Sequence, residues 1–225
     1  MKKMMVLLLC LMTIVSLSSP AFAADNDFEL RNGILFGDTM KDILQKEKTL
    51  SQKDGNSNIF SGTVSGIDGT DCCFCFDSAE KLNGMYYMFP RARSRSEGDT
   101  RYKTLQDGLV RKYGESEYIT LFELFPSQAY EKMLQQLAFS SMSGYKYDLV
   151  NAAEWMLPVN GGYVEIDIYE FCYGPSKDNM DYYVYLGYRF YTDREFDQIL
   201  AKQQAEIDSQ KRADDEKKRV VDDDL

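Results

Sequence analysis

The segments YVEIDIYEFCY (residues 163–173) and YYVYLGYRFY (residues 182–191) carry the clearest strand signals in the chain. In the first segment Val164, Ile166 and Ile168 alternate with other residues, which is typical of a strand that rests one face on a core. The segment Asn160-Gly161-Gly162 comes directly before it and is a strong turn signal. Short connections of this kind favour antiparallel pairing.

Earlier residues predict a first group of strands. We expect strands over residues 59–67, 72–76 and 85–89, with turns at Asp68-Gly69 and Asn83-Gly84. Together with residues 155–159, the two later segments then form a second group of three.

Helix signals lie on either side of each group of strands. Thr39 with Asp42 resembles a capping box, and Thr192 with Glu195 is one. A helix is expected to begin at Asp99 or Thr100 and to stop at Gly114, and another to begin near Pro126.

We therefore predict an α+β fold, in which two helix–three-strand meander units form one antiparallel sheet or two, with helices packed on one face. The predicted organisation is a signal peptide over residues 1–23, a first unit over 24–114, a second unit over 115–191, and a charged C-terminal helix and tail over 192–225.

The first 23 residues resemble a secretory signal. Lys2 and Lys3 precede an apolar stretch that is too short for a membrane span, and Ala21-Phe22-Ala23 is an A-x-A cleavage site. An uncleaved anchor is the alternative. No second stretch of 18 apolar residues follows, so we expect a secreted or envelope-exterior protein with no transmembrane segment after cleavage near Ala23.

Composition excludes several classes of function. The 225 residues include no histidine, which removes Ser-His-Asp and Cys-His catalysis and histidine-bound metals. The net charge is −10, and loss of the two lysines of the signal segment makes it −12. Such a surface repels phosphate backbones, so nucleic acid is not an expected partner. We expect no cofactor.

Four cysteines follow the signal segment, at positions 72, 73, 75 and 172. They include no C-x-x-C motif, and no histidine completes a metal site. Exported proteins meet oxidising conditions, which makes Cys72 and Cys172 candidates for a disulfide. Three pairings are open in principle, and buried cysteines acting as small apolar side chains are an equal alternative.

The stretch RNGILFGDTMKDIL (residues 31–44) is similar to the G-M-[ST]-x-x-[DE]-V opening of the BamE/SmpA-like outer-membrane lipoproteins. Gly37, Thr39, Asp42 and Ile43 match that pattern, whereas Asp38 replaces its usual methionine. The order of elements also resembles the tandem helix–sheet units of the β-lactamase-inhibitor proteins. LVRKYG, which ends at Gly114, is similar to helix ends of uncharacterised secreted Firmicutes proteins. The resemblance implies a small exported α+β binding module and carries no catalytic residue.

Tyrosine is unusually frequent, with 16 in the chain, and strand alternation gathers several on the side away from the core. We call this side the tyrosine face and predict that it binds a ligand through an exposed aromatic patch. The face is defined by Tyr163, Glu165, Asp167, Tyr169, Tyr183, Tyr185 and Arg189. The alternative is that these tyrosines are covered, or pair across strands to stabilise the sheet.

These observations favour a non-enzymatic binding or interaction module whose partner is an envelope or extracellular protein or a glycan. The alternative is an extracellular hydrolase that uses Glu165 and Asp167 as a carboxylate pair. In the tail, 11 of the 15 residues from Lys211 to Leu225 are charged. This favours a frayed, solvated helix end, and a projecting helix that contacts a partner is the second interpretation.

Overall fold

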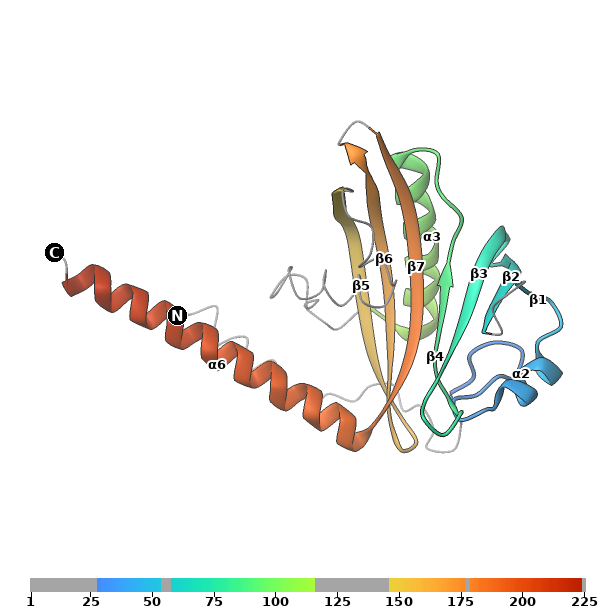
Figure 1. Cartoon of the computed structure of the whole chain (residues 1–225), viewed down its shortest axis with the longest axis horizontal. Helices are drawn as coiled ribbons and strands as arrows, with labels where there is room; N and C mark the ends of the chain where they lie inside the picture. Colours follow the sequence, from blue (N-terminus) through green and yellow to red (C-terminus); the bar gives the residue numbers. More distant parts are fainter. Residues whose placement is uncertain (1–27, 54–57, 116–145, 177–178, 224–225) are drawn as a thin grey trace.

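The computed structural model describes residues 28–53, 58–115, 146–176 and 179–223. Its centre is one seven-stranded antiparallel sheet with the strand order β1-β2-β3-β4-β7-β6-β5. The strands are β1 (Ser51–Gln52), β2 (Ile59–Val64), β3 (Ile67–Phe76), β4 (Leu82–Met88), β5 (Lys146–Val159), β6 (Gly162–Ser176) and β7 (Asn179–Thr192). The predicted α+β class is confirmed, and the sheet is continuous because β4 pairs with β7 (Figure 1).

Three helices accompany the sheet in the described part of the chain: α2 (Met40–Lys46), α3 (Arg95–Tyr113) and α6 (Asp193–Asp223). The predicted capping boxes are both present. Thr39 accepts from the Asp42 amide at the start of α2, and Thr192 accepts from the Glu195 amide at the start of α6. No helix among the described residues is long and apolar enough to cross a membrane.

Helix α3 packs on the face of the sheet opposite to the tyrosine face. Tyr102, Leu105 and Leu109 of the helix belong to one buried apolar cluster with Val164, Ile166 and Ile168 of β6. The C-terminal end of the helix is fixed by Gly114, which adopts φ = 88°, and by the Trp155 indole, whose Nε1 donates to the Gly114 carbonyl at 2.9 Å. The predicted stop at Gly114 is therefore confirmed.

Two predicted turns lie elsewhere. The β2–β3 turn falls at Ser65-Gly66, where both residues have positive φ, and Asp68-Gly69 lies inside β3. Asn83-Gly84 likewise lies inside β4. The preceding turn forms instead around Asp77, because its Oδ1 accepts hydrogen bonds from two backbone amides of the loop. The predicted turn before β6 is confirmed, with Gly161 at φ = 80°.

Helix α3 begins at Arg95, four or five residues before the predicted start at Asp99 or Thr100. Ser94 is its N-cap and accepts a hydrogen bond from the Glu97 amide at 3.2 Å. The acidic Glu97 in the first turn also supports a start here. Strand β5 is also longer than expected, since it begins at Lys146 rather than near Trp155.

Helix α6 continues to Asp223 and extends away from the sheet (Figure 1). Its 31 residues correspond to about 46 Å of helix. Its first turn is anchored by Phe196, whose ring stacks on Tyr163 with 3.9 Å between centroids. The chain is therefore helical through most of this tail, and a contact of the helix with a partner stays a prediction. The predicted signal segment and the helix near Pro126 lie outside the described residues.

Candidate functional site

Strands β6 and β7 pair in a register that brings the predicted site residues onto one face. Glu165 lies opposite Arg189, Tyr169 lies opposite Tyr185, and Asp167 lies opposite Gly187. Directly opposed residues in antiparallel strands point to the same side of a sheet. The seven residues of the tyrosine face therefore share one side, as strand alternation predicts.

The expectation that this face is exposed is wrong for its central residues. Tyr169, Tyr185 and Asp167 are each 2% exposed, and Glu165 is 3% exposed. The tyrosine rings pack on one another. Tyr169 stacks on Tyr185 with 5.8 Å between ring centroids, and Tyr185 contacts Tyr86 with 5.6 Å between centroids. Tyr185 lies over Gly187, where an added Cβ would meet its ring. The tyrosines thus form cross-strand pairs in a second buried cluster.

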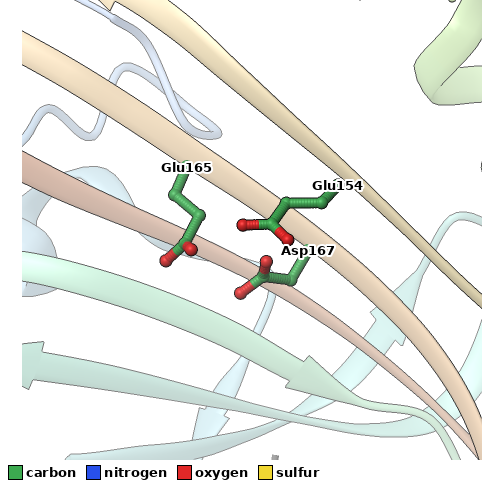
Figure 2. Close-up of side chains that lie close together, drawn as sticks. All are labelled: Glu154, Glu165 and Asp167. Atoms are coloured by element: carbon green, nitrogen blue, oxygen red, sulfur yellow. The ribbon is translucent and has the colours of Figure 1, made fainter. Parts of the chain in front are cut away.

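Three buried carboxylates lie together on this face. Glu154 of β5 is directly opposite Asp167, and Glu165 is the next residue along β6 on the same side. Each offers one oxygen, and these oxygens lie within 4.8 Å of one another. Figure 2 shows Glu154 and Asp167 converging from neighbouring strands, with Glu165 beside them. We call Glu154, Glu165 and Asp167 the carboxylate cluster.

A cationic side chain lies next to the carboxylate cluster. Arg189 Nη1 donates to the Tyr191 hydroxyl at 3.4 Å, and that hydroxyl donates to Glu165 Oε2 at 2.7 Å. Burial by itself would lower the pKa of Arg189, but Tyr191 and Glu165 outweigh burial and raise the pKa. Tyr191 therefore links a guanidinium to one carboxylate of the cluster.

The chemistry open to this cluster follows from its oxygens and its burial. Carboxylate oxygens are preferred ligands of hard divalent cations, so these three residues are the described groups that could hold such an ion. Hydrolysis of a glycan would instead require a cleft between the two carboxyl groups. With exposed fractions of 2–5%, the three residues do not offer a polymer such access.

The cysteines differ from the predicted arrangement. All four described cysteines are free thiols, and the suggested Cys72–Cys172 disulfide is wrong in this structure. Cys72 lies on β3 and Cys172 on β6, and β4 and β7 separate these strands. Three strand spacings amount to about 14 Å, which is beyond the reach of a disulfide. Both residues are buried, as the small-apolar alternative predicts.

A hollow of about 290 Å³ lies at the end of the sheet where α6 begins. We call it the basal hollow. Its apolar lining includes Phe28, Phe36 and Phe190. The ring centroids of Phe28 and Phe36 are 6.1 Å apart, and those of Phe36 and Phe190 are 5.7 Å apart. Its polar lining consists of Asp77, Lys81, Asn83, Asn160, Thr192 and Glu195. An apolar lining with a few polar groups is typical of a binding site.

Comparison with known proteins gives no relative for this chain. It matches no known protein family, no curated protein resembles it significantly, and no solved structure resembles it significantly. The candidate site is therefore assigned only from the geometry of this chain's own residues.

The sequence did not single out Glu154 and Tyr191, which lie beside the residues of the tyrosine face, as site residues. Glu154 was missed because β5 was expected to begin at Trp155, although Ala152, Glu154 and Met156 alternate with Ala153 and Trp155. Strand alternation places Tyr191 on the same side of β7 as Arg189, but its contact with Glu165 depends on the β6–β7 register. Glu170 is fully buried on the side of the sheet that faces α3, and the sequence did not predict it as a site residue.

Proposed function

We propose that this protein is an exported, non-enzymatic binding module of the cell envelope or exterior, and that it binds a protein at the basal hollow and along α6. The observation that carries this proposal is the position of the hollow. Thr192 and Glu195, which form the capping box of α6, are also lining residues of the hollow. The root of the projecting helix and the apolar lining thus form one continuous surface.

The composition of this surface favours a protein partner. Aromatic side chains provide contact area, while Lys81 and Glu195 are exposed charged groups at the rim. Helix α6 carries ten acidic and seven basic residues, and it exposes Leu200 near its root. A long charged helix with an apolar residue beside a hollow is suited to contact a folded partner.

A hydrolase that uses Glu165 and Asp167 remains the second proposal, and the structure supports it less. A third carboxylate, Glu154, lies beside Glu165 and Asp167, and Arg189 lies near them. Such a group of charged side chains would suit acid–base chemistry. The burial of all three carboxylates argues against access for a glycan. Activity on a glycan panel that is lost in the Glu165→Gln, Asp167→Asn double variant would favour this second proposal.

We propose further that the chain contains two copies of one helix–meander unit, in line with its resemblance to small exported modules. Strands β2, β3 and β4 are consecutive antiparallel neighbours, and so are β5, β6 and β7. The two groups meet through their last strands, β4 and β7.

Site-specific photocrosslinking in the producing cell tests the binding proposal. A photoreactive residue placed at Lys81 or Glu195 should give the same protein adduct, identified by mass spectrometry. Lys103, an exposed residue of α3, is the matched control position and should give none. Adducts of equal yield at Lys103, or none at the rim, would reject the basal hollow as the site. A carbohydrate adduct in place of a protein adduct would show that the partner is a glycan.

A further inference from the structure

Two carboxylates line the basal hollow, and each is fixed in place by one of its oxygens. Asp77 Oδ1 accepts hydrogen bonds from the amides of Ala79 and Lys81 in the β3–β4 turn, at 2.8 Å and 2.9 Å. Glu195 Oε2 accepts from the amide and the hydroxyl of Thr192, at 2.9 Å and 2.8 Å. Both carboxyl groups are therefore oriented before any ligand arrives.

The other oxygen of each carboxylate is open to a ligand. In the part of the chain that the structure describes, Asp77 Oδ2 and Glu195 Oε1 accept no hydrogen bond, and neither carboxylate forms an ion pair. The hydrogen bonds from Thr192 lower the pKa of Glu195, and the charge of Asp77 acts in the opposite direction. The hollow thus holds two negative charges that repel each other.

The basic side chain in the lining does not neutralise these charges. Lys81 is exposed, and no ion pair joins it to a described residue of the hollow. Its charge acts instead on α2, where hydrogen bonds from Thr39 lower the pKa of Asp42 and the Lys81 charge adds to the lowering. A cation bound in the hollow would therefore relieve the repulsion between Asp77 and Glu195.

The apolar lining narrows the choice of cation. Phe28, Phe36 and Phe190 are half-buried and present aromatic rings to the hollow. An arginine guanidinium is planar and weakly hydrated, stacks on such rings, and donates in parallel to carboxylate oxygens. The volume of about 290 Å³ lies at the lower limit of about 300 Å³ for small-molecule sites, so it suits one side chain.

We propose that the basal hollow binds one arginine side chain of the partner protein. This inference rests on the proposed function, which places a protein at the hollow, and it names the group that is recognised there. The guanidinium lies against the aromatic rings and donates to Asp77 Oδ2 and Glu195 Oε1. The methylene stem of the arginine packs on the apolar lining.

The first test uses the full-length, isotope-labelled protein and a short capped peptide that contains one arginine among glycines and serines. The peptide should shift the amide resonances of the lining residues Gly37, Asn83 and Asn160 in a saturable way. A citrulline peptide, in which a neutral urea replaces the guanidinium, should bind about tenfold more weakly. A lysine peptide should also bind more weakly. Equal affinity for the citrulline or the lysine peptide would overturn the proposal.

Conservative variants test the two carboxylates without removing their structural hydrogen bonds. Asp77→Asn and Glu195→Gln each retain an oxygen that can accept in the turn or the cap, but lose the charge. Each should weaken binding of the arginine peptide about three- to tenfold. Glu80→Gln is the matched control, because Glu80 is an exposed carboxylate of the same β3–β4 turn and does not line the hollow. An equal effect of Glu80→Gln would overturn the role of the two carboxylates.

Photocrosslinking from position 81 separates this inference from the function on which it rests. Glu195→Gln should reduce the yield of the protein adduct, whereas Glu80→Gln should not. An adduct that forms equally in both variants would reject the arginine and leave the hollow as a protein-binding site. The absence of any adduct without these changes would reject the proposed function itself.

Discussion

Gly98 of α3 lies directly over the carboxyl group of Glu170 on β6, so that a methyl group at position 98 would collide with Glu170 Oε1. Glu170 Oε2 accepts a hydrogen bond from Asn151 Nδ2 at 2.5 Å. The carboxyl group of Asp99, which follows Gly98 on α3, also acts on Glu170 and raises its pKa. A fully buried carboxyl group therefore forms part of the contact between the helix and the sheet.

This contact predicts that Gly98→Ala destabilises the protein. Alanine favours a helix over glycine by about 1 kcal/mol, but the displaced Glu170 should more than cancel that gain and give a net loss of about 1–3 kcal/mol. Gly108→Ala on the same helix is the control, because a Cβ there meets only Arg111 at an ordinary 3.8 Å. Urea denaturation of both variants measures the effect. A Gly98→Ala variant as stable as Gly108→Ala would contradict the contact.

Glu170 also predicts a loss of stability as the pH rises. Burial, opposed by the Asn151 hydrogen bond but assisted by Asp99, raises the pKa of Glu170 from 4.5 to about 7. The folded state therefore holds a proton that the unfolded state has lost, and stability falls between about pH 4.5 and about pH 7, by at most about 3 kcal/mol. Glu170→Gln should flatten this part of the profile in denaturation experiments at several pH values.

The matched variant for this titration is Asp99→Asn. Removing the Asp99 charge should lower the pKa of Glu170 and move the fall in stability to lower pH. Parallel pH profiles for the unaltered protein and Glu170→Gln would show that another group is responsible.

The stacking of Phe196 on Tyr163 predicts how α6 is attached. Phe196→Ala should remove the anchor and increase amide hydrogen exchange through the first turns of α6, with a loss of stability of about 2–4 kcal/mol. Leu200→Ala removes a side chain that is 37% exposed and should leave both quantities nearly unchanged. Faster exchange in both variants alike would mean that the helix has no specific anchor.

Export predicts a defined N-terminus. Mass spectrometry of protein collected from outside the cell should give a chain that begins at or within one residue of Ala24. Replacing Ala21 and Ala23 by bulky residues should block processing and leave the longer form in the membrane fraction. Mature material that begins at Met1 would reject the signal peptide.

Local signals predicted much of this fold. Thr39 with Asp42 and Thr192 with Glu195 identified helix starts, because a capping box is satisfied within four residues. The alternation around Ile166 identified the two faces of β6 in the same way. Asn83-Gly84 failed because the Asp77 side chain closes its own turn and leaves that dipeptide to the strand.

The candidate site was less predictable because it depends on register and burial. The shared face of Glu165 and Arg189 followed from alternation, but Glu154 joins them only through the pairing of β5 with β6. The burial of Tyr185 depends on Gly187 and on the stacked Tyr169, which are contacts between strands rather than within one. A single strand segment contains no information about which neighbour will cover it.

The pairing of β4 with β7 also governs how the chain reaches its folded state. Gly84 and Arg189 are partners although about a hundred residues separate them, so the central seam of the sheet forms only after a large loop has closed. Until β7 arrives, β4 presents an unpaired edge, which is a template for association with another chain. Folding should therefore be slow, and a truncated or still-emerging chain that lacks β7 should aggregate through β4.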